Sequence, residues 1–187
     1  MERERLLFEQ LHIDNVPPTY HVHAALFRDV TNAKFLHEQL LARNSDFEYA
    51  FVDATAIFSR TQLLSAIFRA LTGLINGRLA TPNVHSEIVL SLSSNNNIAD
   101  AYRRFGITPG STQDIIVVKT WGHLSENVAG KPVPLTDDEI RQTTDWTKVR
   151  KYYKLNNLPV VDAEKDPVAR QAIWERLAIM SMALRGV

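Results

Sequence analysis

Two pairs of ionisable side chains have types and spacings that could support chemistry. His21 and His23 lie two residues apart in a segment expected to be extended, so both imidazoles would project from one face and could bind a metal ion. The neighbouring sequence offers no third ligand, and ordinary surface or partly buried histidines account for the pair. We therefore predict no metal site.

The second pair is His85 with Glu87, on a segment expected to be a strand with both side chains on one face. A histidine beside a carboxylate can act as a general acid and base, which keeps a small hydrolase or transferase open as an alternative function. Two polar side chains on one strand face also commonly pair with each other or contact water. The adjacent carboxylates Asp137, Asp138 and Glu139 fit the first turn of a helix, where negative charge is favoured. No convincing catalytic constellation remains, so we predict a protein that is not an enzyme and needs no cofactor.

Composition sets further bounds on the class of protein. With 187 residues, 45% of them hydrophobic, the chain suits one domain over residues 1–187, of which 1–19 form an N-terminal extension. The 21 Lys and Arg residues balance the 21 Asp and Glu residues, so any contact with nucleic acid must come from a local patch. Cysteine is absent, which excludes disulfides, cysteine-bound zinc and a thiol nucleophile. The charged start MERERLLFEQL resembles neither a signal peptide nor a membrane span, and we expect a protein of nucleus and cytoplasm with no membrane partner.

The hydrophobic pattern predicts the elements that must position these residues. We expect strands at about 20–27, 48–53, 86–93 and 114–121, with the last one central, and helices at about 31–43, 60–76, 97–105 and 166–184. Thr31 is expected to cap the first of these helices, and Gly77 to end the second. A further helix begins after Thr136 and leads into a basic helical segment at Trp146, whereas 122–135 reads as a surface loop. Strands that alternate with helices would predict a doubly wound parallel sheet, but the glycine-rich first turn of a nucleotide-binding fold is missing.

The C-terminal helix is apolar on more than one side. Ile173, Leu177, Met180 and Leu184 cluster on one face, which is enough to dock the helix on its own core. A second stripe holds Trp174, Ala178 and Met182, and a third face holds Ile179 and Ala183. Such a helix is buried twice. The second burial is either internal, under the 122–135 loop, or against a partner protein, for which Trp and Met are typical.

Cations form two candidate RNA-binding regions. In the first, basic and aromatic side chains alternate: Lys148, Arg150, Lys151 and Lys154 lie among Trp146, Tyr152 and Tyr153. Such a mixture can contact phosphates and stack on unpaired bases. A solvated helix face with one tyrosine packed inside explains the pattern too. The second is a turn region around Arg78, Thr81, Asn83 and Ser86 and the 93–97 loop, followed by Arg103 and Arg104. Helix capping explains the asparagines equally well. Arg69, Arg78 and Lys119 are the cations of this surface to substitute first.

One long stretch carries a family resemblance. The run NVHSEIVLSLSSNNNIADAYRRFGI from Asn83 to Ile107, read with the last four residues LRGV, resembles the kinase-binding subunit family of the KEOPS/EKC complex, in the form of a fungal member. The similarity extends from about Tyr20 to Val187 and includes these segments: ALF at 25–27, VTNA at 30–33, FVD at 51–53, the apolar residues of 63–71, IIVVK at 115–119 and KYYKL at 151–155.

The resemblance implies a fold, partners and site residues. It implies an α/β chain of the α+β type: a small, mainly antiparallel sheet of four to five strands packed against several helices in a single domain. The direct partner would be the small atypical RIO-like kinase of the complex, with the ASKHA-type threonylcarbamoyl transferase subunit as an indirect partner. The implied kinase interface is made of Trp174, Ala178, Ile179, Met182, Ala183, Leu184 and Val187.

The resemblance also implies a role with RNA. Archaeal members of the family recognise the single-stranded 3′ end of tRNA, in a complex that modifies the adenosine beside the anticodon. The predicted tRNA contacts are Arg69, Arg78, Asn83, Arg103, Lys119, Lys148, Arg150, Lys151 and Lys154. A stand-alone RNA-binding module that needs no kinase is the remaining alternative.

Overall fold

An antiparallel sheet forms the centre of the molecule. The structure is a computed structural model, and it describes residues 8–121 and 127–186. Its strands are β1 (Glu9–Leu11), β2 (Val22–Arg28), β3 (Ala50–Asp53), β4 (Ile115–Thr120) and β5 (Lys131–Val133). They follow the order β1-β2-β4-β3, with β5 paired to the far end of β2, and each pairing is antiparallel. The antiparallel prediction is therefore confirmed, the parallel alternative is wrong, and β4 is central as expected.

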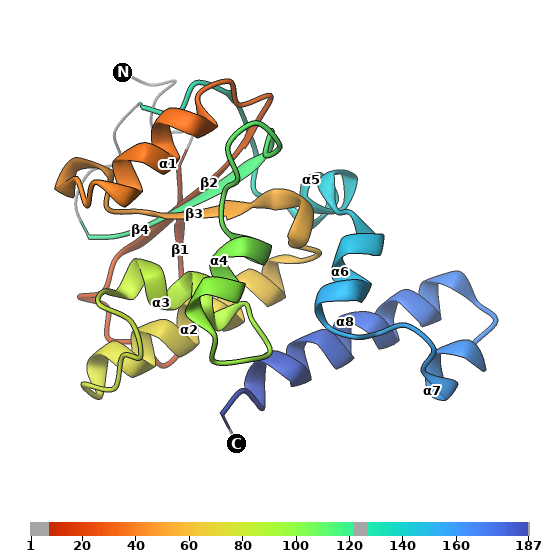
Figure 1. Cartoon of the computed structure of the whole chain (residues 1–187). Helices are drawn as coiled ribbons and strands as arrows, with labels where there is room; N and C mark the ends of the chain where they lie inside the picture. The colour runs from red at the N-terminus through yellow and green to blue at the C-terminus, as the bar shows by residue number, and fades with distance from the viewer. Residues whose placement is uncertain (1–7, 122–126, 187) are drawn as a thin grey trace.

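Helices cover both faces of this sheet (Figure 1). In chain order they are α1 (Ala33–Leu41), α2 (Arg60–Ile75), α3 (Val84–Ser91), α4 (Ile98–Phe105), α5 (Asp137–Thr143), α6 (Trp146–Tyr152), α7 (Pro159–Asp162) and α8 (Pro167–Ala183). Alternate residues of β2 and β4 point to opposite faces. Leu26 and Val118 belong to the core shared with α2 and α3, whereas Phe27 and Val117 belong to the smaller core under α1.

One predicted strand is a helix. Residues 84–91 form α3, which begins where the Asn83 side chain accepts a hydrogen bond from the backbone N–H of Ser86 at 2.8 Å. Seven of its eight residues are buried, so the helix shows no polar stripe, and a short apolar run of this kind cannot be distinguished from a buried strand by its pattern. Because it is helical, His85 and Glu87 do not share a face.

Several local predictions can be checked against the backbone. The Thr136 hydroxyl accepts from the N–H of Glu139 at 3.2 Å and caps α5, and Gly77 ends α2 with a φ of 63°, both as predicted. The cap position of α1 is Asn32 rather than the expected Thr31. The expected loop at 122–135 contains the short strand β5, and its residues 122–126 lie outside the described residues.

Candidate docking surface

Helix α8 packs on the body through a narrow stripe near its C-terminal end. Ala178 and Met182 are buried, at 0% and 3% exposure. Trp174 lies partly buried one turn earlier and packs on Trp146, with ring centroids 5.8 Å apart, while the Arg150 guanidinium lies 5.0 Å from the centre of its ring. The second predicted stripe is therefore the one that docks on the protein's own core.

The stripe predicted to face the core does so only through Leu177, which packs against the core, whereas its C-terminal part lies outside. Met180 and Leu184 are 55% and 60% exposed, and Ile173 and Leu177 are half-buried. On a helical wheel these residues lie opposite Ala178 and Met182. The prediction of two apolar sides is confirmed, but the buried residues of α8 belong to the second stripe and the most exposed ones to the first. Tertiary packing selected the side with the small Ala178 and with Trp174, which stacks into the aromatic group of Trp146 and Phe58.

The exposed side of α8 continues onto α2. Phe68 and Ile75, one heptad apart on α2, are each 41% exposed. Between the two helices lies a hollow of about 380 Å³, lined by Ser65, Phe68, Arg69, Thr72, Ser91, Ile179, Met182 and Ala183. Its floor includes Ser91, which is fully buried and whose hydroxyl has no hydrogen-bond partner among the described residues. We call Phe68, Ile75, Ile179, Met180, Ala183 and Leu184, with this hollow, the docking face.

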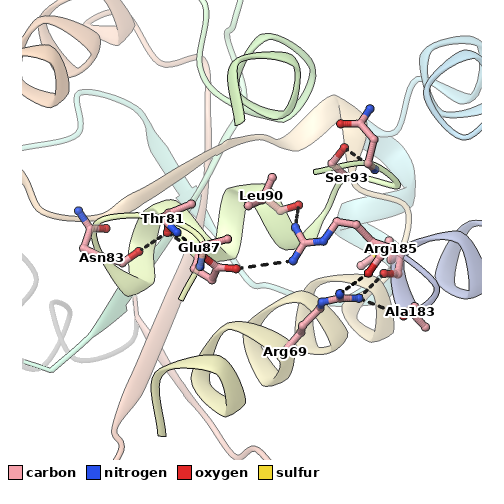
Figure 2. A network of polar contacts seen from close by, with 11 residues as sticks. Arg69, Thr81, Asn83, Glu87, Leu90, Ser93, Ala183 and Arg185 are labelled. Carbon is pink, nitrogen blue, oxygen red and sulfur yellow. Dashed lines mark hydrogen bonds and ion pairs between the residues drawn. The ribbon is translucent and has the colours of Figure 1, made fainter. Parts of the chain in front are cut away.

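Arg69 closes the end of α8 (Figure 2). From α2 its guanidinium donates to the carbonyl oxygens of Met182 at 2.6 Å, Ala183 at 3.0 Å and Arg185 at 2.6 Å. The last carbonyls of a helix have no partners within it, so a cation at that end both satisfies them and complements the helix dipole. Arg69 thus fixes the C-terminal end of α8 against α2.

A buried ion pair then connects the chain end to α3. Arg185 is 5% exposed, donates to the carbonyl of Leu90 and lies 3.6 Å from the Glu87 carboxylate. Glu87 in turn accepts from the N–H groups of Ala80 and Thr81 at 3.0 and 2.9 Å and from the Thr81 hydroxyl at 2.8 Å. Burial and then the neighbouring Arg69 lower the pKa of Arg185, and Glu87 opposes both. Figure 2 shows this network running from the Thr81 turn to the chain end.

The predicted kinase-interface residues therefore divide into three groups. Ile179, Ala183 and Leu184 belong to the docking face, and their role stays a prediction. Ala178 and Met182 are buried in their own chain, and Trp174 is partly buried against Trp146 and Arg150, so these three pack α8 on the rest of the protein. Val187 lies outside the described residues. Sequence reasoning missed Phe68 and Ile75, whose spacing of seven on α2 was the available signal, and the buried pair of Glu87 and Arg185.

Most of the predicted RNA contacts have partners within the protein. Arg69 holds the end of α8, Lys148 pairs with Asp53 at 3.0 Å, and Lys119 donates to the carbonyl of Glu48 at 2.7 Å. Burial lowers the pKa of Lys119. Arg150 lies over Trp174, and Asn83 caps α3.

A smaller basic surface remains at the ends of α4 and α6. Arg104 donates to the carbonyl of Tyr152 at 2.9 Å, which brings the two helix ends together. Lys151 and Lys154 are exposed there, and Arg103 is exposed but paired with Asp100. Arg78 is exposed separately, after α2. We call Arg103, Arg104, Lys151 and Lys154 the basic corner.

The candidate catalytic pair is not arranged for chemistry. The His85 imidazole is buried, and its Nε2 accepts from the Thr120 N–H at 3.1 Å; burial, with a smaller effect of Lys119, lowers its pKa to about 3. Glu87 is engaged in the network described above. Within residues 8–121 and 127–186 there is no group of three or more side chains suited to bind a metal, and no helix long and apolar enough to cross a membrane.

The chain is similar to known proteins over nearly its whole length. A family model described as kinase binding protein CGI-121 matches residues 27–186. EKC/KEOPS complex subunit CGI121 of Gibberella zeae is 52% identical, with 97% of this chain and 100% of the relative covered. The subunit of the same name in Neurospora crassa is 47% identical, with 97% and 100% covered, and that of Schizosaccharomyces pombe is 36% identical, with 90% and 95% covered.

Proposed function

This chain belongs to the CGI-121 family of kinase-binding proteins, and we propose from this premise that it is a non-catalytic subunit of an EKC/KEOPS complex that binds the kinase through the docking face. The observation that carries the proposal is the apolar surface of α2 and α8. Met180 and Leu184 remain more than half exposed although the same helix already buries Ala178 and Met182 of its second stripe. Exposed apolar side chains around an apolar hollow between two packed helices are typical of protein interfaces.

In the proposed complex the partner is a small atypical kinase of the RIO-like type, and its N-terminal lobe contacts the docking face. The apolar hollow between Phe68 and Ile179 would accept a side chain of the kinase, since apolar anchors that fill pockets supply much of the affinity in interfaces. The C-terminal turn of α8 forms part of this face, and the contacts of Arg69 and the ion pair of Glu87 and Arg185 hold that turn in place. A rigid helical face of this kind would hold the small lobe in one orientation.

The finer part of the proposal concerns tRNA. The basic corner, together with Arg78, would contribute contacts to the 3′ end, and the ASKHA-type transferase subunit elsewhere in the complex would carry out the modification. What supports this part is the exposure of Lys151 and Lys154 beside the half-buried ring of Tyr152. Cations give salt-dependent affinity for phosphates, and an aromatic ring at the same place can stack on an unpaired base.

Substitution of Leu184 tests kinase binding directly. Burial of an exposed leucine stabilises a complex by about 1.5–3 kcal/mol, so removal of most of this side chain in Leu184→Ala should weaken the affinity for the kinase by roughly 10-fold. Leu184→Glu would bury an unpaired charge at the same position and should abolish measurable binding. Leu41→Glu is the matched control, because Leu41 is a 71% exposed leucine on α1, which covers the other face of the sheet.

The measurement is isothermal titration of each folded variant with the kinase subunit of the same organism. Wild-type affinity for Leu184→Glu would refute the docking face. If the stand-alone RNA-binding alternative were correct, the protein would bind tRNA without the kinase, and neither leucine substitution would change that binding.

A further inference from the structure

Glu87 and Arg185 form a buried ion pair that simple stability does not explain. Both side chains are almost fully enclosed, at 4% and 5% exposure. Removing two charges from water carries a large desolvation penalty, and apolar residues of similar size often serve a fold equally well at such positions. A buried pair does differ from apolar packing in one respect, because the hydrogen bonds that each charged side chain makes to the groups around it fix its direction.

On one side, the Glu87 carboxylate is itself held rigidly. One oxygen, Oε2, accepts from two backbone N–H groups and a hydroxyl of the Ala80–Thr81 turn, all within 3.0 Å. The other oxygen, Oε1, faces Arg185 at 3.6 Å. The turn contacts leave the carboxylate little freedom, so its Oε1 defines a fixed point inside the molecule.

On the other side, Arg185 directly follows the docking face. Its guanidinium reaches the carbonyl of Leu90 at the end of α3 as well as Glu87. Its backbone carbonyl is held by Arg69, together with those of Met182 and Ala183. The inward direction of Arg185 thus decides that its neighbour Leu184, at 60% exposure, points outward.

We infer that the ion pair of Glu87 and Arg185 positions the docking face, by fixing the turn that follows α8 so that Leu184 and Ala183 are presented to a partner. This inference rests on the proposed function, since it assigns the pair a role in the same interface. Glu87 and Arg185 are positioning residues here, because both are enclosed and neither lies on the docking face itself.

The experiment separates positioning from stability with four proteins: wild type, Arg185→Met, Glu87→Gln and the double variant Glu87→Gln/Arg185→Met. Arg185→Met leaves Glu87 buried without its cation, so the melting temperature of this variant should fall below that of wild type. The double variant buries neither charge and should regain most of that loss. Kinase affinity should nevertheless stay at least 10-fold below wild type in Arg185→Met and in the double variant, because neither has a group that bonds to Leu90. Hydrogen–deuterium exchange should be faster at residues 183–186 in both.

Arg185→Lys adds a conservative variant that keeps the charge and loses the forked geometry, and it should recover affinity only in part. Arg43→Met is the matched control, since Arg43 is an exposed arginine after α1 and should bind and melt like wild type. The inference is overturned if the double variant recovers wild-type affinity together with its stability, or if Arg185→Met binds normally. If the double variant does not fold, wild-type affinity in Arg185→Lys overturns it instead.

Leu184→Glu, titrated in parallel, distinguishes this inference from the proposed function. Normal binding by Leu184→Glu would refute the docking face itself, whatever the charge variants do. Loss of binding in Leu184→Glu with normal binding in the double variant would refute only the positioning role.

Discussion

Acidification should destabilise this protein through His85. The imidazole lies at 5% exposure on α3, and its Nε2 accepts from the backbone N–H of Thr120 at 3.1 Å, which requires a neutral ring. Burial lowers its pKa from 6.5 to about 3, with Lys119 as the smaller cause. A second hollow, separate from that of the docking face, is lined by His85, Asp46 and Glu48, and these two carboxylates do not reverse the shift of the His85 pKa.

The size of the effect follows from linkage between proton binding and folding. Between pH 6.5 and pH 3 the unfolded chain carries a proton on His85 and the folded chain does not, so stability falls as the pH falls. From pH 7 to pH 5 the unfolded imidazole becomes almost fully protonated while the folded one stays neutral. This difference lowers the free energy of unfolding by about 2 kcal/mol, at up to ~1.36 kcal/mol for each pH unit.

Urea unfolding at pH 7 and pH 5 measures this loss, with His85→Gln as the comparison. The glutamine amide is neutral at both pH values and can accept from the Thr120 N–H with its side-chain oxygen. The other five histidines are the same in both proteins, so their contribution cancels. Wild type should lose about 2 kcal/mol more than His85→Gln over this interval. Equal losses in the two proteins would refute the assignment of a buried neutral imidazole.

Two further predictions concern a buried hydroxyl and the basic corner. Tyr153→Phe should lower the free energy of unfolding by about 1–3 kcal/mol, because the Tyr153 hydroxyl donates to the carbonyl of Leu92 at 2.6 Å and accepts from the Gln62 amide at 2.9 Å. Tyr152→Phe, at a half-buried ring, should change this free energy little. Equal urea midpoints for the two variants would contradict the prediction. Replacement of Lys151 and Lys154 by alanine should weaken tRNA binding by the assembled complex. The slope of log affinity against log salt should fall by roughly one for each phosphate that the variant no longer neutralises. An unchanged slope in filter-binding titrations would show that the basic corner does not contact the RNA.

The sequence determined much of the local structure of this protein. Alternating and helical patterns predicted β2, β4, α2 and the last helix, and the spacing of Thr136 and Glu139 predicted the cap of α5. These features depend on neighbours within a few residues, so the sequence carries them directly. The LRGV end and the Asn83–Ile107 run pointed to the family that the relatives share.

Tertiary structure alone decided which side of α8 faces outward and which cations are free. Helix α8 has apolar residues on more than one side, so its own pattern could not select between Ala178 with Met182 and Met180 with Leu184. The aromatic packing of Trp146 against Trp174 made that choice. For the same reason, the sequence pattern of α3 was read as a strand: the helix is buried on almost every side, so its apolar run has no helical period. Arg69 is bound to the carbonyls of residues more than a hundred positions away, and Arg185 pairs with a carboxylate almost as distant. Partners so far apart in the chain meet only when it folds, because local periodicity carries no information about which elements lie side by side.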